Sequence, residues 1–130
     1  MAKTSREILQ LAKRTLTIES ESISGLKLFL NDSFAEVVKL ISKSSGRLIV
    51  SGIGKSAIIA QKMVATLNST GTPSIFMHAA DAIHGDLGII QNHDIIICIS
   101  KSGDTPEIKV LVPLLKSWGN TLIAMTGNPS

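Results

Sequence analysis

Two short segments of the sequence combine glycines with hydroxyl residues in a way that suits the binding of an anion. Residues 51–56 read SGIGKS, and residues 100–105 read SKSGDT. Glycine lets the backbone approach a ligand closely, and serine and threonine hydroxyls can donate hydrogen bonds to phosphate oxygens. Each segment follows an apolar run and precedes a helical pattern, so free amides and the helix dipole would favour negative charge there. Together the two segments predict a pocket for a phosphorylated small molecule.

The first segment also matches parts of two nucleotide-binding motifs. A P-loop needs a glycine five residues before Gly54, where the sequence has Ile49. A dinucleotide fingerprint needs an acidic residue about 20 positions further on. Met77 and His78 stand there instead. A nucleotide-binding Rossmann domain is therefore an alternative that these mismatches weaken.

The first third of the chain has helical periodicity. Apolar residues recur at helical spacing over residues 5–23 and again over residues 26–41. The second pattern contains the sequence NDS at residues 31–33, where Ser33 and Glu36 could form a capping box. Whether this stretch is one helix or two is left open by the pattern. We assign residues 1–45 to an N-terminal helical segment.

Residues 46–130 have the pattern of an α/β core. Four apolar runs lack strict alternation, as expected of parallel strands buried on both faces: residues 48–50, 75–77, 95–99 and 122–125. Helical stretches lie between them at residues 56–69, 79–87 and 106–118, the last with Thr105 as the predicted N-cap. This order predicts a three-layer αβα sandwich, doubly wound and flavodoxin-like, preceded by helices. Because no helix follows the last strand, we expect this core to be incomplete at its C-terminal end.

Composition excludes several classes of protein. Thirteen Lys and Arg against ten Asp and Glu leave a net charge of +3, and aromatic residues make up 3% of the 130 residues. So mild a charge and so few aromatics argue against a nucleic-acid partner. The single cysteine fits a reducing compartment, and no apolar run approaches the ~20 residues of a membrane helix. We expect a cytoplasmic protein with no membrane partner.

Four motifs give a resemblance to a known family. GIGKS at 52–56, STGTP at 69–73, AIHGDLG at 82–88 and SKSGDT at 100–105 resemble the sugar isomerase (SIS) domain. HGDLG narrows the resemblance to the D-arabinose-5-phosphate isomerases. It implies a five-stranded parallel sheet, a homotetramer, a sugar-phosphate substrate and no organic cofactor. The implied reaction interconverts D-ribulose 5-phosphate and D-arabinose 5-phosphate through an enediol(ate), for 3-deoxy-D-manno-octulosonate and lipopolysaccharide biosynthesis.

The resemblance also suggests roles for individual residues. Lys55 would stabilise the enediolate, Glu107 would act as base or organise Lys55, and His84 and Asp86 would contact the sugar hydroxyls, reach in from a neighbouring subunit or hold an adventitious metal. Hydroxyls and backbone amides would hold the substrate phosphate, supplied by Gly54, Ser56, Ser100, Ser102, Gly103 and Thr105.

Simpler explanations exist for several of these residues. Acids are common in the first turn of any helix, which would account for Glu107, and Lys55 could be a solvated surface lysine. One His-x-Asp pair is a poor metal signature, so we expect no required metal. Cys98, among isoleucines, is expected to be a buried apolar residue.

The resemblance implies further residues and leaves a second alternative function. Members of the family carry a further glutamate and histidine in a part of the SIS domain that corresponds to residues after 130. A non-catalytic SIS module of a phosphosugar-sensing regulator is the second alternative. The N-terminal helices have no basic recognition face, which argues against it.

Overall fold

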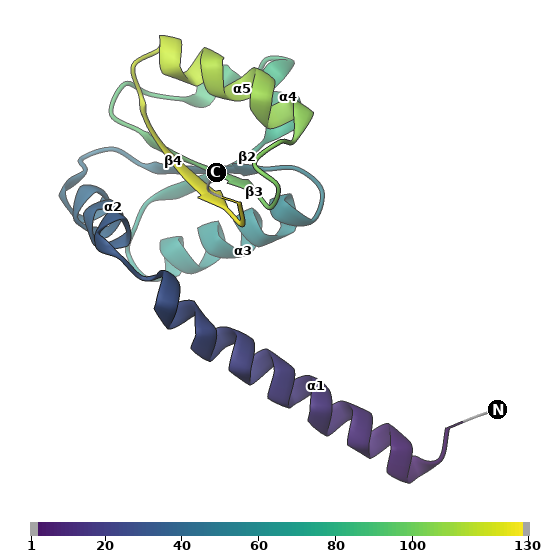
Figure 1. Ribbon diagram of the computed structural model, residues 1–130. Helices are drawn as coiled ribbons and strands as arrows, with labels where there is room; N and C mark the ends of the chain where they lie inside the picture. The colour runs from purple at the N-terminus through teal and green to yellow at the C-terminus, as the bar shows by residue number, and fades with distance from the viewer. Residues whose placement is uncertain (1–2, 129–130) are drawn as a thin grey trace. The chain divides into compact units, whose positions relative to one another are not determined.

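The computed structural model describes residues 3–128. The chain divides between Val38 and Lys39 into two units, which are described separately. The first contains the helix α1 (Ser5–Gly25), the short 3-10 helix η1 (Leu26–Phe29) and the beginning of α2 (Asp32–Lys43). The second contains the rest of the described chain, including a β-sheet with its covering helices (Figure 1).

Helix α1 begins with a complete capping box. The Glu7 amide donates to Thr4 Oγ1 at 3.3 Å, and the Thr4 amide donates to Glu7 Oε2 at 2.7 Å. The bond from the Thr4 amide, together with one that the Thr4 hydroxyl donates to the same carboxylate oxygen at 2.9 Å, lowers the pKa of the Glu7 carboxyl. The sequence left open whether residues 26–41 form one helix or two. The structure has two elements there, since η1 ends at Phe29 and α2 begins at Asp32. There the Phe34 amide donates to Asn31 Oδ1 at 3.3 Å, whereas no bond joins Ser33 to Glu36 in the described chain.

The sheet has four parallel strands in the order β2-β1-β3-β4. They are β1 (Leu48–Gly52), β2 (Ser74–His78), β3 (Ile95–Ser100) and β4 (Thr121–Thr126). The connecting helices are α3 (Lys55–Ser69), the short α4 (Ala79–Ile83) with the 3-10 helix η2 (Asp86–Ile89), and α5 (Pro106–Ser117). All four predicted strands and the predicted helices between them are confirmed.

The strands are apolar throughout because both faces of the sheet are covered. On β1, Ile49 packs into a core with α4 and α5, while Leu48 and Val50 pack into a second core with α3. Figure 1 shows α4 and α5 on one side of the strands and α3 on the other. The predicted three-layer αβα sandwich with a parallel sheet is confirmed. Residues 3–128 supply four of the five strands that the resemblance implies.

An ion pair closes the amino-terminal edge of the sheet. The Asp94 side chain is fully buried and accepts hydrogen bonds from Arg47 Nη2 at 2.6 Å, Arg47 Nε at 3.1 Å and the backbone amides of Arg47 and Gln91. Burial alone would raise the pKa of the Asp94 carboxyl, but these hydrogen bonds outweigh it and hold the pKa below its usual value. The same bond to Asp94 raises the pKa of Arg47.

Candidate functional site

The two glycine- and hydroxyl-containing loops lie at the place where the strand order reverses. The chain leaves β1 through α3 toward β2 on one side, and it leaves β3 through α5 toward β4 on the other. Strands β1 and β3 are neighbours, with Ser51 opposite Cys98. Their following loops, residues 53–54 and 101–105, therefore emerge side by side at the carboxyl edge. In open α/β sheets this crevice is the usual ligand site.

The loop between β3 and α5 is folded by its own hydroxyl groups. Ser100 is buried, and its Oγ lies 2.7 Å from Thr105 Oγ1 and accepts a hydrogen bond from the Gly103 amide at 3.2 Å. Ser102 Oγ accepts from the Asp104 amide at 3.1 Å. Gly103 has a φ of +72°, a conformation that favours glycine, and a Cβ there would lie 3.3 Å from Thr126 Oγ1.

This arrangement leaves hydrogen-bond donors for a ligand. Ser102 Oγ accepts within the loop, so its O–H is still able to donate, and the Ser100–Thr105 bond uses only one of two O–H groups. Thr105 stands at the N-cap position as predicted, but the expectation that its hydroxyl caps α5 is wrong, because that hydroxyl is bonded to Ser100 instead. The amides of the first turn of α5 therefore lack a side-chain cap and can face an anion.

The loop between β1 and α3 is a tight turn. A Cβ on Gly52 would lie 3.0 Å from the Ser56 carbonyl carbon and oxygen, so glycine allows the strand and the helix to approach. Gly54 is the N-cap of α3, with a φ of +57° and no side-chain cap. Lys55 is the first residue of α3 and is exposed, while Ser56 is half-buried. An exposed ammonium therefore stands at the carboxyl edge of β1.

The remaining predicted residues lie on the α4 and α5 side. Glu107 is half-buried in the first turn of α5. His84 and Asp86 are exposed on either side of Gly85, which has a φ of +139°. Within residues 3–128, no hydrogen bond or ion pair joins Glu107 to Lys55, or His84 or Asp86 to either of them. Hydrogen bonds within the chain hold the β3–α5 loop together. By contrast, no direct bonds in the described chain join the four side chains of Lys55, His84, Asp86 and Glu107.

A pocket of about 570 Å³ opens beside the β3–α5 loop. Ser102, Gly103 and Asp104 line one side, and Thr126 and Asn128 at the end of β4 line another. The sequence analysis did not predict Thr126 or Asn128. The signal that identified Ser100, its place at the carboxyl end of a parallel strand, could have identified them as well. The floor is apolar and includes Cys98, whose thiol pKa is raised by burial to about 11.

Other features of the site concern charge. Asp104 in the β3–α5 loop forms an ion pair with Lys109 one turn into α5, a contact that the sequence reasoning did not anticipate. In the described part of the chain, no three His, Cys, Asp or Glu side chains are grouped so that they could hold a metal ion.

No helix among these residues has the length and apolar character needed to cross a bilayer.

The fold and the two loops define an α/β domain with a candidate ligand crevice at its switch point. The model of the SIS domain family matches residues 40–130, and the chain belongs to this family. Arabinose 5-phosphate isomerase KdsD of Pseudomonas aeruginosa is 44% identical over 123 residues, which are 95% of this chain and 38% of that protein. The chain therefore spans well under half the length of this relative.

Solved structures agree with the assignment of the fold. A Listeria monocytogenes protein superposes with a TM-score of 0.94 at 35% identity, covering 99% of this chain and 68% of that one. A protein of Escherichia coli CFT073, solved in complex with arabinose 5-phosphate, superposes with a TM-score of 0.90 at 39% identity, covering 95% of this chain and 66% of that one.

Proposed function

We propose that this chain is the phosphosugar-binding part of an aldose–ketose isomerase that interconverts D-ribulose 5-phosphate and D-arabinose 5-phosphate. The observation that carries the proposal is the β3–α5 loop, with its free hydroxyl donors and uncapped helix amides beside the β1–α3 loop. A related protein is named for this reaction, and another was solved with arabinose 5-phosphate.

In this proposal the loops hold the substrate phosphate. Ser102, Thr105 and Ser56 donate O–H groups, and the backbone at Gly103 and Gly54 lets phosphate oxygens come close. Ser100 is buried and bonded to Thr105 and Gly103, so it acts by holding the loop in shape. Neutral donors of this kind bind a dianion without the cost of burying a cation.

The reaction itself is a proton transfer. A base removes a proton from C1 of the ketose, and the electron pair forms an enediolate with its negative charge on O2. A proton then moves from O1 to O2, and the proton taken from C1 is delivered to C2 to give the aldose. Glu107 is the proposed base, and Lys55 would stabilise the developing negative charge on the sugar oxygens. Both stand in the first turn of helices that begin at the carboxyl edge, on the two sides of the switch point. His84 and Asp86 are proposed to contact sugar hydroxyls.

Several wider expectations belong to the same proposal. The enzyme would be a homotetramer in the cytoplasm, where phosphorylated sugars are held because they do not cross membranes. It would supply 3-deoxy-D-manno-octulosonate synthesis. A further glutamate and histidine, expected from the family in the part that follows residue 130, would take part in proton transfer and ring opening.

The test is an isomerase assay on the full-length protein. Ribulose 5-phosphate is the substrate, arabinose 5-phosphate is the measured product, and NAD(H) binding is the comparison. We expect Lys55→Ala and Glu107→Gln to lower kcat by roughly 100-fold or more, as removal of a catalytic acid–base or charge-stabilising group does. Lys62→Ala and Glu36→Gln, which change the same residue types at exposed positions of α3 and α2, should leave kcat unchanged.

Other outcomes of these assays would remove a residue from the proposed chemistry or favour one of the alternative functions. Wild-type turnover in a Lys55 or Glu107 variant removes that residue from the chemistry. Phosphosugar binding without turnover favours the sensing module, and affinity for NAD(H) without phosphosugar binding favours the nucleotide-binding alternative.

A further inference from the structure

The β3–α5 loop contains an acidic residue at the place where the proposed function puts a phosphate dianion. Asp104 stands between Gly103 and Thr105, and it lines the pocket beside the loop together with Ser102 and Gly103. Its backbone amide donates to Ser102 Oγ at 3.1 Å, which holds the residue within the loop. A carboxylate in this position repels a dianion, so its charge works against binding.

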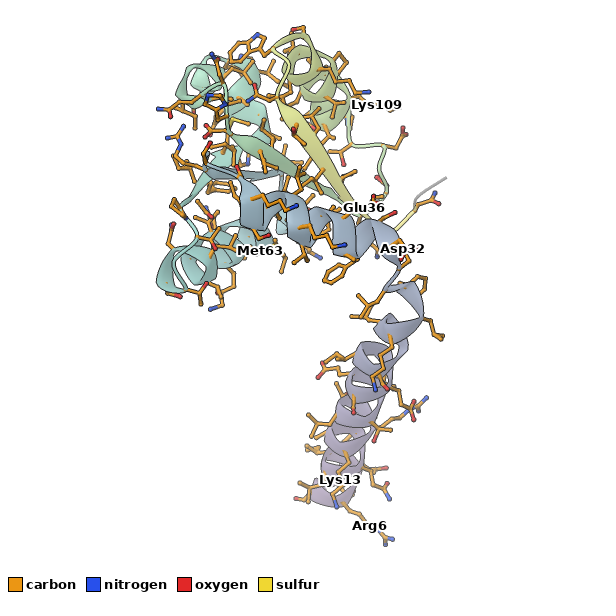
Figure 2. The ribbon with its side chains drawn as sticks, turned by 90° about the vertical axis from the view of Figure 1, so that its left-hand side faces the viewer. Arg6, Lys13, Asp32, Glu36, Met63 and Lys109 are labelled. Atoms are coloured by element: carbon orange, nitrogen blue, oxygen red, sulfur yellow. The ribbon has the colours of Figure 1, made fainter. Side chains whose placement is uncertain are left out.

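Lys109 compensates the charge of Asp104. Its Nζ forms an ion pair with Asp104 Oδ1 from a position one turn into α5, on the exposed side of that helix (Figure 2). The side chains of Lys109 and Asp104 are 59% and 72% exposed, and ion pairs so exposed contribute little to stability. A cation near the start of a helix is also the opposite of what the helix dipole favours. The stability of α5 therefore does not explain why a lysine stands here.

The balance of charge around the loop depends on this lysine. Residues 101–109 carry two acids and two bases, which are Lys101, Asp104, Glu107 and Lys109, so their net charge is zero. Without Lys109 the same stretch would have a net charge of −1 beside the phosphate. The uncapped amides at the start of α5 supply partial positive charge, and an uncompensated carboxylate next to them would offset it.

We infer that Lys109 is a positioning residue for the phosphosugar, which neutralises Asp104 and so permits a dianion to bind in the β3–α5 loop. The inference rests on the proposed function, since it requires that this loop hold the substrate phosphate. Among the described residues, Asp104 lines the pocket and Lys109 does not, so Lys109 acts through Asp104 and not on the ligand. A purely structural ion pair would instead act by holding the loop in shape, and the two roles predict different effects of substitution.

The test removes each member of the ion pair in turn and measures the Kd for arabinose 5-phosphate by calorimetry on the full-length protein. Lys109→Gln leaves Asp104 uncompensated and should raise the Kd roughly fivefold to tenfold, as one added negative charge near a dianion implies. Asp104→Asn breaks the same ion pair but removes the repelling charge, so its Kd should equal or fall below that of the wild type. The double variant should bind like the wild type, because the two changes in charge cancel.

Two control variants and a salt series separate charge from structure. Lys109→Arg keeps the charge and should keep the wild-type Kd. Lys116→Gln removes the same charge from an exposed position of α5 two turns further from the loop and should leave the Kd unchanged. The loss of affinity in Lys109→Gln should shrink from about 0.1 M to about 1 M salt, because the Debye length falls from about 10 Å to about 3 Å. In the isomerase assay, Lys109→Gln should raise KM and leave kcat unchanged, since Lys109 has no part in the proton transfer.

Two results would overturn the inference. One is a Lys109→Gln variant that binds arabinose 5-phosphate as tightly as the wild type does. The other is an equal loss of affinity in Lys109→Gln and Asp104→Asn, because the ion pair would then act only by holding the loop in shape. A wild-type protein that does not bind arabinose 5-phosphate would instead reject the proposed function on which the inference rests, so the two failures are distinguishable.

Discussion

The amino-terminal and carboxyl-terminal edges of the sheet differ in how completely their buried polar groups are hydrogen-bonded. At the amino edge, Asp94 is buried and accepts four hydrogen bonds, and Asn120 Nδ2 donates to the Gln91 and Asp94 carbonyls at 2.9 and 3.0 Å. At the carboxyl edge, the buried hydroxyl of Ser51 has no hydrogen-bond partner within residues 3–128.

This difference suggests that the amino edge mainly stabilises the fold and that the carboxyl edge mainly serves binding. A buried polar group with all its bonds made holds the fold together, whereas donors that remain open are available to a ligand. Substitutions at the amino edge should therefore have the larger effect on the free energy of unfolding, whereas those in the loop after β3 should mainly change affinity for a phosphosugar. The following predictions test this contrast.

The largest effect is expected at Asp94. Asp94→Asn leaves the Arg47 guanidinium without its counter-charge and should lower the free energy of unfolding by about 3 kcal/mol. Urea denaturation measures this, and phosphosugar affinity of the folded variant should be unchanged. Asp86→Asn makes the same substitution at an exposed position on the other edge and should change stability little. Equal destabilisation by both variants would contradict the proposed contrast.

Gly103 should show a smaller effect that falls mainly on binding. Alanine at its φ of +72° is strained and would crowd Thr126 Oγ1, so Gly103→Ala should distort the β3–α5 loop. We expect phosphosugar affinity, measured by calorimetry, to fall roughly tenfold, which is about 1.4 kcal/mol. Gly119→Ala, at a φ of +79° with open space around it, imposes similar backbone strain away from the loop and should leave affinity unchanged. Equal losses of affinity would show that the loop geometry is not what binds.

Ser51 should respond in the opposite sense to Asp94. Ser51→Ala removes a buried hydroxyl that has no partner and should raise the free energy of unfolding by up to about 1 kcal/mol. Ser100→Ala removes a hydroxyl that is bonded to Thr105 and Gly103 and should lower it by about 1 kcal/mol. A Ser51→Ala variant less stable than wild type would mean that this hydroxyl is satisfied in solution.

The smallest effect is the acid dependence of the amino edge. Hydrogen bonds hold the pKa of Asp94 below its unfolded value of about 3.9, so its contribution to stability is present above that pH and is lost as the pH falls through the lower folded pKa. The stability difference between wild type and Asp94→Asn should accordingly be constant from about pH 7 to 5 and shrink below about pH 4. A difference that does not change with pH would rule out this charge as its source.

Much of the fold was predictable because it depends on local patterns. Unbroken apolar runs predict strands covered on both faces, and Thr105, Pro106 and Gly119 predict the limits of α5. The β3–α5 loop was predictable as an anion site for a similar reason, since its hydroxyls and glycine lie within six consecutive residues. The role of Thr105 was not, because its hydroxyl could bond either to the helix amides or to Ser100.

By itself, the sequence determined which segments are strands and helices and which loops carry donors, since those properties follow from residues close together in the chain. Only the tertiary structure decided which segments meet. Arg47 and Asp94 are 47 positions apart, and Thr126 approaches Gly103 from the next strand. The physical reason is that the pairing order of parallel strands brings remote residues into contact, and no local periodicity records that order.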